Sequence, residues 1–166
     1  MNDFSIHFRP ISVDDFTEVL KWSRDQAFCL ANDWELDRDR EELYDWWLRC
    51  VKLNETNFKR IGIECNSRLI GYADLANINE TSAEIGIAIG ESTLWGKGIG
   101  TYALQHFINY ASNLFYISTF HAETHETNLR SRKMLEKVGF KEISSVGTEL
   151  YNGEVTQLIQ YQLLKD

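Results

Sequence analysis

The stretch from Glu84 to Thr101, EIGIAIGESTLWGKGIGT, constrains the fold of this chain more than any other segment. Its first half alternates isoleucine with small residues at the period of two of a β-strand, which predicts one core face and one nearly bare face. A bare face of glycine and alanine lets a ligand lie close to the backbone. Three alternating glycines follow, Gly96, Gly98 and Gly100, just before a helical segment. We therefore expect backbone N–H groups and a helix N-terminus to converge on a phosphate.

Two common phosphate-binding motifs do not fit this glycine turn. A P-loop requires Ser or Thr after its Gly-Lys pair, whereas Gly98 follows Lys97 here. A dinucleotide-binding turn has the spacing G-x-G-x-x-G, and this chain has G-x-G-x-G instead. The turn therefore belongs to neither of these classes.

The spacing resembles motif A of the GNAT N-acetyltransferase superfamily, [QR]-x-x-G-x-[GA], which falls here on Trp95, Gly98 and Gly100. A second segment, NLRSRKMLEKVGF from Asn128 to Phe140, is similar to the second signature of that superfamily, an asparagine that opens a helix ending in E-K-x-G-F. Each match alone is weak, but the two together are specific. The resemblance covers essentially the whole chain and implies an acetyl-coenzyme A dependent N-acetyltransferase, closest to the RimJ/RimL-like branch.

Hydrophobic periodicity predicts the order β-α-α-β-β-β-α-β-α-β-β, about seven strands with four helices. This is the order of the mixed α/β sheet of the GNAT fold. The expected strands cover residues 5–9, 58–65, 68–76, 84–90, 117–123, 140–151 and 154–164. Ser12 or Asp14 is expected to cap the first helix, and Asp37 or Asp39 the second. The segment 29–36 has no periodicity and predicts an irregular loop between these two helices.

Length and composition restrict the class of protein. The 166 residues predict a single domain over 1–166, and 43% hydrophobic residues with 13% aromatics exclude a disordered chain. A net charge of −8 argues against a nucleic-acid partner and suits a cationic amine substrate, although the acidity could equally serve solubility. With no leader-like N-terminus and no apolar run near ~20 residues, we expect a cytoplasmic protein without a membrane partner.

The resemblance implies a cofactor site for acetyl-coenzyme A. The strand backbone at Ile87, Ala88 and Ile89 would pair with the pantetheine arm. The pyrophosphate would lie over the turn, on Trp95, Gly96, Lys97, Gly98, Ile99, Gly100 and Thr101. Asn128 matches a cofactor-contacting residue, but it could equally act as a helix N-cap, since one side chain can do either.

The resemblance also implies catalytic residues. Glu84 lies where many superfamily members carry the glutamate that accepts the amine proton, although it could be an ordinary solvated carboxylate. The tyrosine that protonates the leaving thiolate in many relatives is Leu135 here. In the RimJ/RimL-like branch a serine on the same helix is a candidate acid, and by this resemblance it would be Ser131 here. A thiolate of pKa near ~8.5 could also leave without one.

The acceptor side and the partners are less constrained. By resemblance, the acceptor side of the cleft would be walled by the early loop residues Asn32, Asp33, Trp34 and Glu35. Trp34 could stack on the acceptor or fill the core. The sequence HAETH at 121–125 lacks the helical spacing of a metal motif, and three scattered cysteines suggest no disulfide framework, so no metal is expected.

The acceptor itself stays open between a protein N-terminus, a polyamine, an aminoglycoside and a small metabolite amine. A competing hypothesis is a non-catalytic acyl-coenzyme A binding module that keeps the fold and has lost turnover. A homodimer through the C-terminal hairpin is a further expectation.

Overall fold

The structure is a computed structural model that describes residues 4–166. Over these residues the chain forms eight strands: β1 (Ile6–Pro10), β2 (Lys59–Cys65), β3 (Arg68–Ala76), β4 (Ser82–Ile89), β5 (Thr119–His125), β6 (Lys141–Ser144), β7 (Thr148–Tyr151) and β8 (Glu154–Leu164). The α-helices are α1 (Phe16–Trp22), α2 (Gln26–Asn32), α3 (Arg40–Lys52), α4 (Ile99–Phe115) and α5 (Leu129–Val138). Two short 3-10 turns, η1 (Val13–Asp15) and η2 (Ser92–Leu94), precede α1 and α4.

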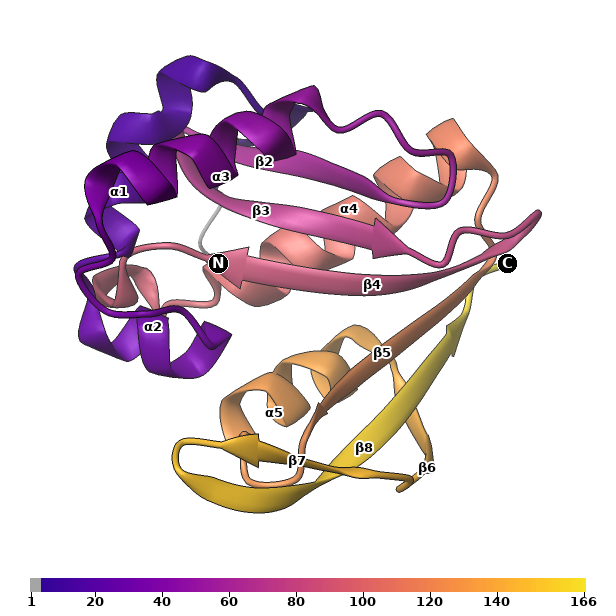
Figure 1. Cartoon of the computed structure of the whole chain (residues 1–166). Coiled ribbons are helices and arrows are strands. Elements are labelled where there is room, and N and C mark those ends of the chain that lie inside the picture. The colour runs from indigo at the N-terminus through magenta and orange to yellow at the C-terminus, as the bar shows by residue number, and fades with distance from the viewer. Residues whose placement is uncertain (1–3) are drawn as a thin grey trace.

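The strands form one mixed sheet in the order β1-β2-β3-β4-β5-β8-β6, with β7 also paired to β8. Strands β4 and β5 pair in parallel, and the other neighbouring strands pair antiparallel. Helices α1, α2 and α3 lie on one face of the sheet, and α4 lies on the other (Figure 1). The predicted mixed α/β sheet is confirmed.

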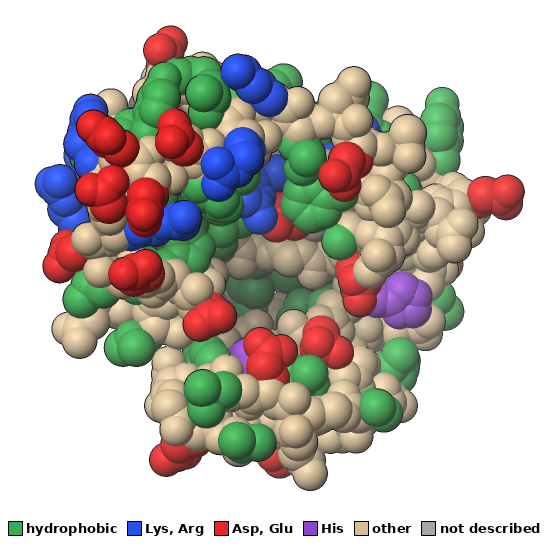
Figure 2. Space-filling model, in the orientation of Figure 1, with side chains coloured by type: hydrophobic (Ala, Val, Ile, Leu, Met, Phe, Trp, Pro, Cys, Tyr) green, Lys and Arg blue, Asp and Glu red, His purple; other side chains and the backbone are tan. Residues whose placement is uncertain are grey.

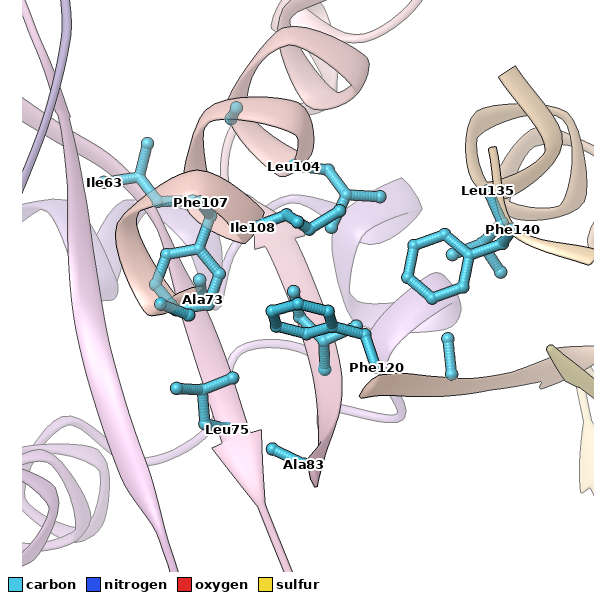
Figure 3. Close-up of a cluster of buried hydrophobic side chains, with 14 of the residues drawn as sticks. Ile63, Ala73, Leu75, Ala83, Leu104, Phe107, Ile108, Phe120, Leu135 and Phe140 are labelled. Atoms are coloured by element: carbon cyan, nitrogen blue, oxygen red, sulfur yellow. The ribbon is translucent and has the colours of Figure 1, made fainter. Parts of the chain in front are cut away.

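Each face of the sheet has its own hydrophobic core. On the α4 face, Phe107 and Leu104 of α4 meet Phe120 of β5, and Phe140 extends this cluster towards α5 (Figure 3). On the opposite face the largest fully buried side chains are aromatic: Trp22, Phe28 and Trp47. Burying side chains of this size contributes roughly 1.5–3 kcal/mol each. The two cores therefore fix the sheet between two helical layers.

Strands β4 and β5 separate soon after they meet. They pair only from Ser82–Glu84 to Thr119–His121, yet β4 continues to Ile89 and β5 to His125. Beyond the paired residues the strands diverge into a V (Figure 1). Half of β4 therefore has no strand partner on its β5 side.

The early helical region differs from the sequence prediction. The segment 29–36, predicted to be an irregular loop, begins inside helix α2, and only the part after Asn32 is irregular. The side chain of Asp25 caps α2 by accepting a hydrogen bond from the Phe28 N–H at 3.2 Å. Asp33, in the left-handed conformation with φ 54°, ends the helix. The apolar residues of α2, 27–31, are consecutive and show no helical spacing, which is why α2 was missed.

The C-terminal hairpin also differs in detail. The arm predicted over 140–151 divides into β6 and β7, which pair with different parts of the same edge of β8. The amide of Gln160 fills the break, since its side chain both donates to and accepts from the Val146 backbone at 2.9 Å. Because of this division and of helix α2, the described residues form more strands and helices than the expected seven and four. The two residues left between the expected strands, Asn152 and Gly153, form the turn before β8, with φ of 52° and 80°.

The predicted helix ends are largely correct. Ser12 opens the first helical region through a capping box with Asp15, and the Asp39 carboxylate caps α3. Gly139, with φ 116°, ends α5. These caps depend on residues only a few positions apart, so the local sequence was sufficient to find them.

Candidate active site

A cavity of about 540 Å³ occupies the gap between the diverging strands β4 and β5. Most of its lining comes from four segments: residues 85–89 of β4, the glycine turn with the start of α4, residues 122–125 of β5, and the first turns of α5. Figure 2 shows the molecule hollowed near this gap, with Asp and Glu side chains gathered on the rim. The cavity is thus bounded by the two elements that the glycine motif joins and by the helix of the second motif.

The open edge of β4 presents backbone groups to the cavity. Gly90 N–H donates to the Ile70 carbonyl of β3 at 2.7 Å. Because backbone hydrogen bonds alternate sides along an antiparallel strand, the N–H and C=O groups of Ile87 and Ile89 point away from β3, into the gap. Ile87, Ala88 and Ile89 all line the cavity. Their backbone can therefore pair with an extended ligand, as a further strand would.

The bare face of β4 makes room for a packed tryptophan as well as for a ligand, whereas the sequence predicted only the ligand. A Cβ placed on Gly90 would lie 2.0 Å from Nε1 of Trp22, so this glycine admits the tryptophan of α1. Ala88 is also buried under this aromatic layer. At Gly86, by contrast, nothing lies within 4 Å of an added Cβ. Only the part of the bare face around Gly86 is open to a ligand.

Two residues of the glycine turn have left-handed backbone conformations with open space around them. Gly96 and Gly98 have φ of 77° and 85°, and an added Cβ would meet nothing within 4 Å at either position. Gly98 caps α4, a helix of 17 residues. Of the predicted cofactor residues, Trp95, Gly96, Gly98, Ile99, Gly100 and Thr101 line the cavity, and Lys97 lies outside the lining. Free space and a helix N-terminus together suit a pyrophosphate group.

Asp25, which the sequence analysis did not identify, links the turn to α2. Its Oδ2 accepts a hydrogen bond from the Ser92 N–H at 2.6 Å, across 67 positions of sequence. Partial burial would raise the pKa of Asp25, but the N–H groups of Ser92 and Phe28 outweigh it, and the pKa is lowered. Because the carboxylate form is favoured, the hydrogen bond from Ser92 is fully formed at pH values above the ordinary pKa of an aspartate. It weakens only when acid protonates the carboxylate. No local pattern marks such a long-range contact.

Helix α5 forms the wall opposite the turn. Asn128 accepts a hydrogen bond from the Ser131 N–H at 3.2 Å, so it caps the helix, and it also lines the cavity. Both roles considered for Asn128, helix cap and cofactor contact, are therefore compatible with the structure. Ser131 lines the cavity as well. Three basic residues share this wall, Arg130, Lys133 and Lys137, although the sequence analysis did not single them out.

The four residues predicted to wall the acceptor side lie in different surroundings. Of the early loop, Asn32 lines the cavity, whereas Asp33 and Glu35 are exposed outside the lining. Trp34 packs edge-on between Phe28 and Trp46, with ring centroids 5.0 and 5.1 Å away, so it is partly buried against the core and lies outside the cavity lining.

Carboxylates from the C-terminal half face the same cavity. Glu123 and His125 of β5 line it together with Glu149 of β7. His125 stacks on Tyr151 at 4.2 Å between ring centroids, and its Nε2 lies 4.0 Å from Glu149. The alternation of β5 could have indicated that residues 121, 123 and 125 share a face, but the approach of Glu149 depends on the fold of the β7–β8 hairpin.

Glu84 lies where β4 and β5 part. It is the last β4 residue paired with β5, opposite His121, and its side chain is exposed. The Nδ2 of Asn77 donates a hydrogen bond to Glu84 Oε2 at 2.5 Å. Glu84 thus stands at the end of the gap, next to the cavity-lining Ile85.

The residues that the structure describes contain no group of three or more His, Cys, Asp or Glu side chains arranged to hold a metal ion. His121, Glu123 and His125 share one strand face and do not form such a group. The three cysteines, Cys29, Cys50 and Cys65, are free thiols.

Comparison with known proteins assigns the chain to a family. The family model described as "Acetyltransferase (GNAT) domain" matches residues 5–141, which include both sequence motifs. The chain belongs to the GNAT acetyltransferase family. The predicted resemblance is therefore confirmed, and the cavity described above is the candidate active site of a GNAT domain.

Two relatives are similar to this chain in sequence. YdaF of Bacillus subtilis, whose name places it provisionally among the ribosomal N-acetyltransferases, is 30% identical over 148 residues, which cover 87% of this chain and 77% of YdaF. An uncharacterised protein of Methanocaldococcus jannaschii is 36% identical over 102 residues, which cover 61% of this chain. Our GNAT chain spans only 20% of the length of that archaeal protein.

Solved structures share the fold. Spermidine N-acetyltransferase from Vibrio cholerae, in complex with CoA and spermine, has a TM-score of 0.80 at 19% identity and covers 96% of this chain and 95% of its own. RimL, an α-N-acetyltransferase of ribosomal protein L7/L12 solved with coenzyme A, has a TM-score of 0.81 at 18% identity, with 97% and 94% coverage. At such identities these matches show the GNAT fold.

Family membership makes two further observations informative. Leu135, in place of the tyrosine that many GNAT relatives carry, is buried in the core and offers no proton. Ser131, one helical turn earlier, is the hydroxyl of this helix that lines the cavity.

Among the residues 4–166, no helix is long and apolar enough to cross a membrane.

Proposed function

We propose that this protein transfers the acetyl group of acetyl-coenzyme A to a primary amine by direct attack in a ternary complex. The observation that carries the proposal is the polarity of one continuous cavity. Its glycine-turn end presents amides and a helix N-terminus, its centre is the open edge of β4, and carboxylates line its far side. An anionic cofactor and a cationic acceptor would thus enter the same cavity from opposite ends.

The residues present fit coenzyme A. The space at Gly96 and Gly98 suits the pyrophosphate. The gap-facing N–H and C=O groups of Ile87 and the N–H of Ile89, whose carbonyl accepts from Trp95, suit the amides of the pantetheine arm. When bound, acetyl-coenzyme A supplies the thioester that the amine attacks. The strand edge would orient the thioester carbonyl and would donate a hydrogen bond as charge develops on its oxygen.

Glu84 is the proposed general base. An amine with a pKa near ~10 is almost wholly protonated at neutral pH, so a proton acceptor is needed beside the attacking nitrogen. Two observations support this role: Glu84 lies where the gap opens, beside the cavity lining, and Asn77 donates a hydrogen bond to its carboxylate. Attack forms the N–C bond, breaks the C–S bond and sends the amine proton to Glu84, directly or through water.

Ser131 is the proposed proton donor to the departing thiolate. It lines the cavity on the wall that faces β4, while Leu135 cannot take this role. A thiolate leaves readily near its pKa of about 8.5, so we expect the loss of Ser131 to slow turnover far less than the loss of Glu84.

The acceptor class is a cationic primary amine, either a protein N-terminus or a small amine. Glu123 and Glu149 line the acceptor side, and the chain as a whole carries a net charge of −8. The names of the relatives cover both possibilities, since one acts on a ribosomal protein and another on spermidine. The proposed co-substrate and acceptor require no metal.

The proposal is tested by thiol release from acetyl-coenzyme A against polyamines, aminoglycosides, amino acids and short peptides. Glu84→Gln is compared with Glu126→Gln, which removes an exposed carboxylate outside the cavity lining. We expect turnover of one acceptor class, a loss of at least about tenfold with Glu84→Gln, and no loss with Glu126→Gln. Binding of coenzyme A without turnover of any acceptor would instead support a non-catalytic acyl-coenzyme A binding module.

A further inference from the structure

Arg130 and Trp95 meet across the cavity. The Cζ atom of Arg130 lies 3.6 Å from the centroid of the Trp95 ring, which is close for a cation–π contact. Trp95 comes from the turn after β4 and Arg130 from the first turn of α5, and both line the cavity. Their contact therefore joins the two walls that face each other over the proposed phosphate site.

Trp95 is a fixed platform for this contact. Its indole N–H donates to the carbonyl of Ile89 at 2.9 Å, and its ring packs against both hydrophobic cores. The motif-A pattern has glutamine or arginine at this position, whereas this chain has tryptophan. A ring held in this way gives the guanidinium of Arg130 a defined plane, which is the geometry a bidentate contact to phosphate needs.

Arg130 has a charge without a carboxylate partner. The ion pairs among the described residues do not include Arg130. Arg132, two positions later, donates a hydrogen bond to the Tyr161 hydroxyl, and its Nη2 lies 3.8 Å from Glu142 Oε2. Although the residue is exposed overall, partial burial of its charged end lowers the pKa of Arg130. A cation that has lost water without gaining an anion is stabilised when an anion enters beside it.

The surroundings of Arg130 extend this positive character. Lys133 and Lys137 follow at helical spacing and line the same cavity, although both are exposed. Opposite them lie the turn at Gly96–Gly100 and the N-terminus of α4. In a chain of net charge −8, a basic helix face next to these amides marks this end of the cavity for an anion.

We propose that Arg130 is a second phosphate-binding residue of the cofactor site, which holds the pyrophosphate of coenzyme A from the α5 side while the glycine turn holds it from the other. This inference rests on the proposed function, because it takes coenzyme A as the ligand of the cavity. Trp95 acts as a positioning residue that orients the guanidinium. Helix α5 thus contributes to cofactor affinity as well as to the wall of the cleft.

Calorimetric titration with three ligands tests the assignment. Coenzyme A carries the pyrophosphate and a 3′-phosphate, dephospho-coenzyme A keeps only the pyrophosphate, and pantetheine has neither. We expect Arg130→Gln to weaken coenzyme A and dephospho-coenzyme A equally, by roughly tenfold or more, and to leave pantetheine unchanged. Lys141→Gln, which removes a positive charge from exposed β6 outside the cavity lining, should leave all three affinities unchanged.

A double-variant comparison tests the role of the ring. Trp95→Leu should weaken coenzyme A by a similar factor, and adding Arg130→Gln to it should cost little more, because the two residues act as one unit. Thermal melts of each variant identify any that fails to fold. Full additivity of the two losses would show that the ring does not position the guanidinium.

Three outcomes would overturn the assignment of Arg130. These are an unchanged affinity for coenzyme A, an equal loss for pantetheine, and a loss for coenzyme A that is absent with dephospho-coenzyme A, which would place Arg130 at the 3′-phosphate. Failure of the unmodified protein to bind coenzyme A would refute the proposed function itself. The two failures are thus distinguishable in one experiment.

Discussion

The two halves of the sheet, on either side of the β4–β5 gap, are stabilised in different ways. The N-terminal half is backed by buried aromatic rings and contains a largely buried ion pair, in which Arg60 bonds Asp74 twice at 2.8 Å. Burial alone would lower the pKa of Arg60, but the hydrogen bonds and charge of Asp74 outweigh it and raise the pKa. Tyr72 covers the guanidinium, with its ring centroid 4.3 Å from Cζ.

The C-terminal half has fewer buried groups and more exposed ones. Ile143, Val146, Leu150 and Val155 are all more than half exposed on its strands and loops. Several of its tertiary contacts are side-chain hydrogen bonds, such as the one that Arg132 Nε donates to the Tyr161 hydroxyl at 3.0 Å.

The difference separates stability from binding. One wall of the cavity is fixed by a packed core, where a substitution costs folding free energy. The other wall, α5 with β5, has the side chains of the proposed binding site at or near the surface, where a substitution should change ligand affinity with little effect on folding. Four predictions test this contrast, in decreasing order of effect.

The largest effect is expected at Gly71 of β3. A Cβ added there would lie 2.1 Å from the carbonyl oxygen of Ala88, a backbone atom that cannot move without separating β3 from β4. We expect Gly71→Ala to lower the free energy of unfolding by about 3 kcal/mol or more. Gly86→Ala is the matched control. Its added methyl meets nothing within 4 Å, so unfolding should change by less than about 1 kcal/mol while ligand affinity falls. Urea titrations of both variants check this, and equal losses would contradict the contrast.

The next effect concerns the buried ion pair. Asp74→Ala would leave the guanidinium of Arg60 largely buried without its carboxylate, and we expect a loss of roughly 3 kcal/mol in unfolding free energy. Glu142, which forms an exposed pair with Arg132 at 3.8 Å in the C-terminal half, is the counterpart. Glu142→Gln should cost below about 1 kcal/mol. Denaturant unfolding at two salt concentrations measures both, and comparable losses would show that the halves do not differ.

The third effect depends on pH. Burial raises the pKa of Tyr72 to about 12, above the usual value near 10 expected in the unfolded chain. The folded state therefore keeps its proton longer, and stability falls as pH rises from about 10 towards about 12. Between pH 9 and 11.5 this group should remove about 2 kcal/mol, a loss absent in Tyr72→Phe. Tyr116→Phe, at a tyrosine that is 80% exposed, should retain the full loss. An equal pH dependence of Tyr72→Phe and the unmodified protein would exclude this origin.

The smallest effect on folding is expected at Asn128. Asn128→Ala removes the cap of α5 and should cost about 1 kcal/mol, whereas Asn128→Ser keeps a capping oxygen and should cost a few tenths. If Asn128 also contacts the cofactor, Asn128→Ser should still weaken coenzyme A several-fold. Thermal melts and calorimetric titrations separate the two roles. If Asn128→Ser keeps both stability and affinity, the role of Asn128 is limited to capping.

The homodimer expected through the C-terminal hairpin stays a prediction. The exposed Leu150 and Val155 are cross-strand partners of β7 and β8, so they present an apolar pair on the hairpin.

Much of the fold follows from short-range patterns. The alternation before the glycine turn, the turn at Asn152–Gly153 and the cap at Asn128 all depend on backbone preferences within a few residues, and the structure contains each of them. Trp34 shows the limit of such patterns. An aromatic residue after an unrecognised helix could face the cleft or the core, and only its contacts with Phe28 and Trp46 place it in the core.

By itself, the sequence determined the family, the strand–turn–helix that can hold a phosphate and the helix that faces it, because these depend on local spacing and on glycine conformations. The tertiary structure alone decided which side chains share the cavity. Asp25 with Ser92, Arg130 with Trp95, and Glu149 with His125 join segments far apart in the chain. Such contacts follow from how the sheet divides between β4 and β5, and a pattern within one segment does not contain that information.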